Sequence, residues 1–145
     1  MDGRGLWLVI IPVQSSDIPV IWPKVEGLVK HALNVTANGR FLPEDILNGL
    51  RAARMQLWLV GKEGLKHAEA LVITEITRYP QKRYCTVTLV AGAQREHWID
   101  HLDTIEAWAM ENNCDGMEAI GRRGWTKEPK LKDWKWRAVV MEKDL

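Results

Sequence analysis

The segment that decides the fold reads AEALVITEITRYPQKRYCTVTLVA and runs from Ala68 to Ala91. It holds two stretches, 68–77 and 83–91, in which apolar and β-branched residues alternate with polar ones, a pattern with the period of a β-strand. The stretch 79–82 between them, Tyr-Pro-Gln-Lys, is a turn signal because proline pre-sets the backbone for a tight turn. We therefore predict an antiparallel hairpin.

The hairpin is flanked by a further strand and by the clearest helix of the chain. Residues 55–60 are apolar and end at a glycine turn over 61–64, which predicts a strand that extends the hairpin to a three-stranded meander. Downstream, apolar residues recur with helical spacing over 95–113. The buried face of this predicted helix consists of Trp98, Ile99, Leu102, Ile105, Trp108 and Ala109.

The N-terminal third predicts one strand and two helices. Residues 6–13 form a short apolar run that we interpret as a buried strand. Ser16 and Asp17 offer N-cap oxygens for a helix whose apolar face continues to Leu33. Pro43 then occupies the first position of a second helix, where its missing N–H is of no consequence.

The C-terminal segment predicts two more strands around a short helix. The strands are 116–120 and 136–141, and the helix falls within 122–131. The resulting order is β-α-α-β-β-β-α-β-α-β, which indicates an α/β protein with a mixed (α+β) sheet and helices on both faces. The length of 145 residues predicts a single domain over 1–145.

The composition argues against several classes of function. A net charge of +1 provides no overall field that would attract nucleic acid. No apolar run reaches the roughly 20 residues of a membrane helix, and no export signal is visible, so we expect a cytoplasmic protein. Cys85 and Cys114 lack metal or redox spacing and are expected to be reduced core residues. His97 and His101, with Asp100 between them, lack an evident third ligand, so no metal site is predicted.

Four local motifs resemble one family. They are the MQLWLV stretch over 55–60, Thr74-Glu75-Ile76, Ala107-Trp108-Ala109, and the IGRRGW stretch over 120–125. Together with the order of elements they resemble the GNAT acetyltransferase family, and in particular the GNAT-like proteins of tailed phages. The resemblance implies an N-acetyltransferase that uses acetyl-CoA and works, if phage-encoded, in the host cytoplasm.

The resemblance also implies a cofactor site. In GNAT enzymes the pantetheine arm of acetyl-CoA lies beside the strand that matches 83–91, and the pyrophosphate binds at the start of the following helix. The matching positions here are Leu89, Ala91, Gly92, Ala93, Gln94 and Arg95. This loop departs from the family pattern because it has one glycine, and because Glu96 and Trp98 occupy the first helical turn. We therefore expect a degenerate phosphate loop.

Two residues are candidates for catalysis by analogy with the family. Glu75 is the candidate general base, since GNAT enzymes often use a glutamate to take the proton of the acceptor amine. The helix that usually carries a tyrosine acid has Trp125 instead, and an indole N–H is too weak an acid for that role. Tyr84 is then the nearest substitute, although simple packing also explains it. The acceptor is expected to be a small-molecule or peptide amine.

A second function class stays open. The chain fits equally well a catalytically inactive GNAT-like protein with a binding or structural role, such as a component of a phage virion. Its C-terminal segment interleaves basic and aromatic residues, a composition that suits a protein partner or a second copy better than nucleic acid here. The candidate partner-binding residues are Arg122, Arg123, Trp125, Trp134 and Trp136.

Overall fold

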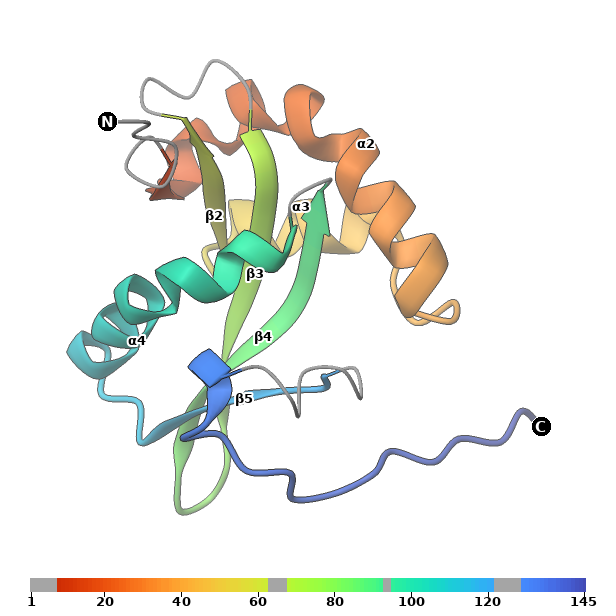
Figure 1. Cartoon of the computed structure of the whole chain (residues 1–145). Helices are drawn as coiled ribbons and strands as arrows, with labels where there is room; N and C mark the ends of the chain where they lie inside the picture. The colour runs from red at the N-terminus through yellow and green to blue at the C-terminus, as the bar shows by residue number, and fades with distance from the viewer. Residues whose placement is uncertain (1–7, 63–67, 93–94, 122–128) are drawn as a thin grey trace.

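A computed structural model describes residues 8–62, 68–92, 95–121 and 129–145 (Figure 1). Its centre is a five-stranded sheet in the order β1-β2-β3-β4-β5. The strands are β1 (Leu8–Val13), β2 (Met55–Lys62), β3 (Ala68–Arg78), β4 (Arg83–Gly92) and β5 (Gly116–Ala119). β1 to β4 pair antiparallel and β5 joins β4 in parallel. The predicted meander and mixed sheet are confirmed.

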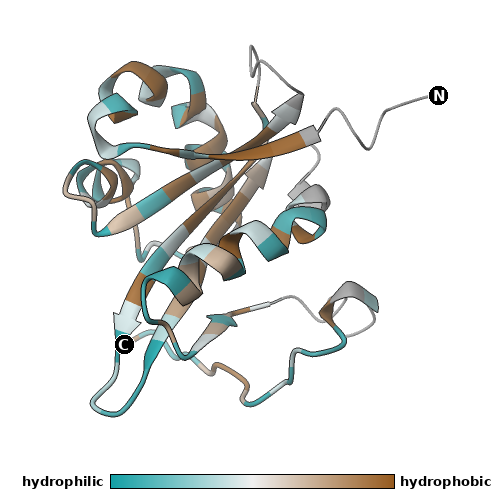
Figure 2. Ribbon diagram, turned by 90° about the vertical axis from the view of Figure 1, so that its left-hand side faces the viewer, coloured by the Kyte–Doolittle hydropathy of each residue, from teal (hydrophilic) through white to brown (hydrophobic). Residues whose placement is uncertain are grey.

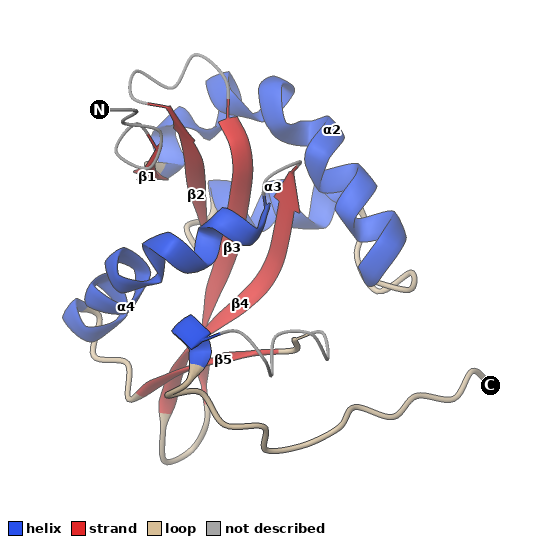
Figure 3. Cartoon of the chain, in the orientation of Figure 1, coloured by secondary structure: helices blue, strands red, loops and turns tan. Residues whose placement is uncertain are grey.

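Helices cover both faces of this sheet (Figure 3). The short 3-10 helix η1 (Ser15–Asp17), α2 (Ile18–Thr36) and α3 (Pro43–Arg51) follow β1, and α2 and α3 pack on one face. The 3-10 helix η2 (Arg95–His101) and α4 (Leu102–Glu111) pack on the other face, with the 3-10 turn η4 (Pro129–Leu131) beside them. We call these the α2/α3 face and the α4 face. No helix within the described ranges has the length and apolarity that a bilayer-spanning segment needs.

Two hydrophobic clusters form the core, one on each side of the sheet. Figure 2 shows the hydrophobic ribbon concentrated along the central strands and the hydrophilic ribbon at the β3–β4 turn. Successive side chains of β2 contribute to opposite clusters: Leu57 and Leu59 point to the α2/α3 face, and Trp58 points to the α4 face. The α4 cluster also buries Cys85, and both cysteines are free thiols, as expected.

The second helix begins as the sequence predicts. Pro43 is its first residue, and the backbone N–H of Leu42 donates to Asp45 Oδ2 at 2.8 Å. This bond satisfies a backbone donor just ahead of the helix, and the acidic side chain suits the positive end of the helix dipole.

A β-bulge in β4 changes which residues face which layer. Ile73 pairs with Leu89, but the next residue of β3, Thr74, pairs with Val87, so Thr88 has no partner on β3. The extra residue reverses the alternation. Cys85 and Val87 therefore lie in the α4 cluster, whereas Leu89 and Ala91 lie in the α2/α3 cluster.

The structure modifies one predicted helix, leaves another largely outside the described residues, and overturns the last predicted strand. The predicted helix 95–113 begins as the 3-10 helix η2 and becomes α-helical only from Leu102 to Glu111. The helix predicted within 122–131 lies outside the described residues up to 128, and the described remainder is the turn η4.

The last predicted strand, 136–141, is wrong, because these residues have no regular secondary structure and stay exposed. A strand needs a partner edge to satisfy its backbone, and this tail is held elsewhere. It leads from the α4 face to the loop after α2, where Glu142 accepts hydrogen bonds from Arg40 and from Asn38 Nδ2.

Candidate functional site

The β4–β5 ladder is short, and its end defines an opening in the sheet. The two strands pair from Tyr84–Gly116 to Val87–Ala119. β4 then continues to Gly92, while β5 ends at Ala119. Figure 1 shows the two strands diverging beyond their shared segment. The edge of β4 over 88–92 is therefore not paired with β5, and its peptide groups are suited to bind an extended ligand that carries amides.

The predicted cofactor residues lie along this edge as far as the structure describes them. Leu89 and Ala91 have buried side chains in the α2/α3 cluster, so only their backbone groups can face a ligand. Ala93 and Gln94 lie outside the described residues, and Arg95 begins η2. The described positions adjoin the opening at the end of β4. Residues 93–94 of the predicted phosphate loop lie outside the described residues.

Gly92 has a structural reason to be glycine. Its φ is +114°, a backbone conformation that residues with a Cβ rarely adopt. A Cβ at this position would also collide with the carbonyl oxygen of Glu69 and would lie 2.6 Å from the Cα of Ala70, the partner of Gly92 in the ladder. The close packing of β3 against β4 therefore accounts for this glycine without a phosphate.

A row of polar side chains crosses three strands next to the opening. Glu75 pairs with Thr86, and Thr86 pairs with Glu118, so the three residues form one line across β3, β4 and β5. Thr86 Oγ1 donates to Glu118 Oε1 at 2.9 Å and lies 2.7 Å from Thr77 Oγ1. Glu75 lies on the α2/α3 face, since its neighbour in β2, Met55, packs into that cluster. The two carboxylates belong to strands roughly 10 Å apart, which is two strand spacings.

Two tyrosines extend this row toward the β3–β4 turn. The hydroxyl of Tyr79 donates to Glu118 Oε1 at 2.8 Å, and its ring meets that of Tyr84 edge to face, with centroids 5.9 Å apart. The bond to the Glu118 carboxylate raises the pKa of Tyr79 above its ordinary value. Tyr84 packs over Gly116, where a Cβ would lie 2.8 Å from the ring.

The structure places the two predicted catalytic residues beside two residues that the sequence analysis did not name. Glu75 and Tyr84, the two predicted catalytic residues, lie on one polar surface. Glu118 and Tyr79 belong to the same surface and were not predicted. The sequence carries a weak signal for Glu118, because it stands between Met117 and Ala119 in a stretch expected to be a buried strand. Only the parallel register with β4 shows that it faces Thr86.

The predicted partner-binding residues are divided. Trp134 is half-buried and packs against the α4 cluster, whereas Trp136 is 51% exposed. Arg122, Arg123 and Trp125 lie outside the described residues. In the described part, this surface therefore consists of Trp136 and the exposed tail that follows it.

Comparison with known proteins identifies the fold. Neither a family model nor a curated protein matches the sequence. Among solved structures, an aminoglycoside acetyltransferase from an uncultured soil metagenomic sample, in complex with sisomicin, aligns with a TM-score of 0.66 at 11% identity, over 97% of both chains. A GNAT family acetyltransferase from Staphylococcus aureus aligns with a TM-score of 0.63 at 11% identity, over 96% of this chain and 99% of that one. An aminoglycoside N-acetyltransferase in complex with CoA aligns with a TM-score of 0.60 at 13% identity, over 94% of both chains. The predicted GNAT-like fold is confirmed, and identities this low establish the fold alone.

Proposed function

We propose that this chain is an N-acetyltransferase that transfers an acetyl group from acetyl-CoA to a primary amine. One observation carries the proposal: the β4–β5 ladder ends at Val87–Ala119, one residue pair beyond Thr86–Glu118. An opening that suits an extended acyl carrier therefore lies directly beside a carboxylate. The fold shared with acetyltransferases supports this assignment, although fold alone does not imply function.

The residues at the opening fit an acyl-CoA arm. Its pantetheine part is extended and carries amides, and the backbone of residues 88–92 offers N–H and C=O groups along one edge. When bound, acetyl-CoA would supply an acyl group activated as a thioester. We further propose that the phosphate loop is degenerate, since its only glycine, Gly92, already serves the packing of β4 on β3. The pyrophosphate would then be held weakly, and we expect a low affinity for acetyl-CoA.

We propose Glu118 as the group that accepts the proton of the amine, directly or through water. An aliphatic amine is protonated at neutral pH, with a pKa near 10.4 for a lysine-like group, and it must lose a proton before its nitrogen can form the new C–N bond. Glu118 is on β5, which borders the opening, whereas Glu75 is separated from the opening by β4. Glu75 would then bind the cationic acceptor rather than deprotonate its reacting nitrogen.

In this proposal Tyr84 has a packing role and not a catalytic one. It pairs with Gly116 at the far end of the ladder, three residues from Val87, a distance of roughly 10 Å along the strand. At that distance its hydroxyl does not reach the opening. The proton that the leaving sulfur needs would then come from water, and the edge-to-face contact of Tyr84 with Tyr79 would position the donor to Glu118.

The substrate class follows from the charge of the surface. Two carboxylates on one face, in strands about 10 Å apart, suit a molecule with more than one ammonium group. Some structurally similar proteins are aminoglycoside acetyltransferases. We propose a polycationic small-molecule amine as acceptor, with sisomicin and spermidine as the first compounds to test.

The test separates cofactor binding from proton transfer. Calorimetry measures acetyl-CoA binding to the wild type, Glu118→Gln and Glu75→Gln, and we expect all three to bind alike. Release of CoA in the presence of each amine then measures turnover. We expect Glu118→Gln to lower kcat about 100-fold, the usual effect of losing a general base, and Glu75→Gln mainly to raise the KM for the amine. Absence of acetyl-CoA binding at millimolar concentration, or wild-type turnover by Glu118→Gln, would refute the proposal.

A second candidate function rests on the C-terminal tail. Its apolar side chains are exposed, with Val139 at 86%, Met141 at 91% and Trp136 at 51%. Such a run of exposed apolar residues is typical of a surface that binds another protein. If acetyl-CoA does not bind, we propose a GNAT-like binding or structural protein that uses this tail, and pull-down with a version truncated after Lys135 would test it.

A further inference from the structure

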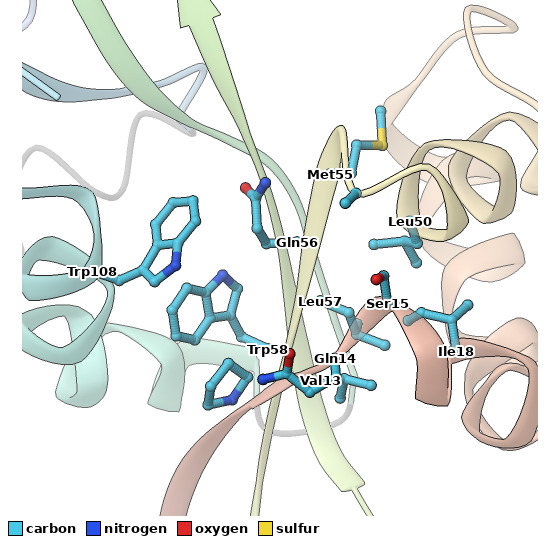
Figure 4. A pocket seen from close by; sticks show the side chains of 12 residues that line it. Val13, Gln14, Ser15, Ile18, Leu50, Met55, Gln56, Leu57, Trp58 and Trp108 are labelled. Atoms are coloured by element: carbon cyan, nitrogen blue, oxygen red, sulfur yellow. The ribbon is translucent and has the colours of Figure 1, made fainter. Parts of the chain in front are cut away.

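A cavity of about 220 Å³ lies where β1 ends and β2 begins (Figure 4). Its walls come from the end of β1, the start of η1 and α2, the end of α3, the first residues of β2, and Trp108 of α4. β1 is the edge strand farthest from β5, so β2 and β3 separate this cavity from the opening beside β4. None of the residues assigned to acyl transfer lines it.

Two indoles stand at one side of the cavity: Trp108 is half-buried, and Trp58 is fully buried at 1% exposed. Trp58 and Trp108 meet edge to face, with ring centroids 5.7 Å apart and an interplanar angle of 82°. Figure 4 shows both rings on one side of β2, with Leu57, Leu50 and Ile18 on the other side. The half-buried ring of Trp108 favours a ligand with a flat, apolar body, since aromatic rings pack best in offset or edge-to-face contact.

A buried hydrogen-bond relay fixes one polar group at this wall. Trp58 Nε1 donates to Thr74 Oγ1 at 3.0 Å, and that hydroxyl donates to Gln56 Oε1 at 2.9 Å. The carbonyl end of the Gln56 amide is therefore occupied, which leaves its Nε2 as the outward end. Within the described part of the chain, Nε2 has no hydrogen-bond partner. The half-buried Gln56 thus presents two N–H donors where it lines the cavity.

The charge and the size of the cavity narrow the choice of ligand. The described residues that line it include no Asp, Glu, Lys, Arg or His. A charged ligand would lose hydration there without gaining an ion partner. A cavity of about 150 Å³ can hold benzene, so this volume fits one ring with a small polar substituent.

We propose that this cavity is a ligand site for a small neutral molecule that consists of an aromatic ring with a carbonyl acceptor, the chemistry of an aromatic carboxamide. The ring packs against the half-buried Trp108, and the carbonyl oxygen accepts a hydrogen bond from Gln56 Nε2. The exposed Gln14 and Ser15 stand at the mouth, where they leave the site open to solvent.

The test uses four probes of similar size and different charge. Benzamide, toluene, benzoate and benzylamine are titrated, without acetyl-CoA, while the indole N–H signals of Trp58 and Trp108 are followed by NMR. We expect saturable shifts with benzamide at about millimolar concentration, the affinity typical of so small a ligand. Toluene should bind at least about fivefold more weakly, because it leaves the Gln56 donors unpaired. Benzoate and benzylamine should bind more weakly still.

A matched pair of variants tests the role of the amide. Gln56→Glu keeps an oxygen for Thr74 but removes both donors, and it should weaken benzamide at least about tenfold. Gln81→Glu makes the same change at an exposed turn residue and should leave affinity unchanged. The inference is overturned if benzamide gives no saturable shift, if toluene binds equally well, or if Gln56→Glu binds benzamide like the wild type. Because binding alone is read, the result is independent of any acyl transfer.

Discussion

Replacing glycine by alanine should have opposite effects at two positions of this chain. At Gly92, alanine must adopt a φ of +114° and place its Cβ 2.6 Å from the Cα of Ala70. The positive φ costs about 1–2 kcal/mol. The collision is with backbone atoms of β3, which cannot rotate away, and we take the overpacking cost of about 1–3 kcal/mol. Gly92→Ala should therefore lower the free energy of unfolding by about 2–5 kcal/mol.

At Gly27 the same substitution should stabilise the protein. This residue lies in the interior of α2, is exposed, and would have nothing within 4 Å of an added Cβ. Alanine loses less backbone entropy than glycine when it enters a helix, which is worth about 0.5–1 kcal/mol. Gly27→Ala is thus the matched control for Gly92→Ala.

Urea unfolding followed by tryptophan fluorescence measures both variants. The reasoning fails if Gly92→Ala unfolds within about 0.5 kcal/mol of the wild type, since positive-φ strain alone should exceed that value. It also fails if both variants shift in the same direction. The result has a practical consequence: because Gly92 is structural, loss of acetyl-CoA binding on its substitution would not by itself locate the cofactor site.

Three further outcomes are expected. Thr74→Val should cost about 1–3 kcal/mol in urea unfolding, because it leaves the buried indole N–H of Trp58 without an acceptor. Burial raises the pKa of Cys85 from about 9 to about 12, so its thiol should resist iodoacetamide at pH 8 until the protein unfolds. Since the unfolded thiol ionises first, the stability that the neutral thiol contributes is complete below pH 9 and lost toward pH 12, and Cys85→Ser should flatten that decline. Arg40→Ala should speed carboxypeptidase trimming of the tail held through Glu142 without a detectable change in Tm, because the pair is exposed.

The sequence predicted the elements whose patterns are local. The alternation in 68–91, the turn at Pro80 and the helix start at Pro43 each depend on residues close together in the chain, and the structure confirms all three. The resemblance drawn from these elements led to the correct fold. The strand predicted at 136–141 is wrong because a local pattern was its only support: its β-branched residues are suited to a strand, but no strand in the described ranges pairs with them.

The candidate site depended on contacts that no local pattern encodes. Glu75 could be named from the sequence, but its alignment with Glu118 requires β4 to pair with β3 on one side and with β5 on the other. Residues 93–115 separate β4 from β5, so the register of these two strands is set by how α4 packs rather than by a tight turn.

The sequence by itself determined the elements from β1 to β5 and, through the resemblance that they support, the fold, because hydrophobic periodicity depends on residues close together in the chain. The tertiary structure decided which polar groups meet. The bulge at Thr88 reverses the faces of β4, and the early end of β5 leaves the edge of β4 open beside Glu118. The bulge is a one-residue difference in pairing, and a pattern with a period of two cannot reveal such a difference until the partner strands are in place.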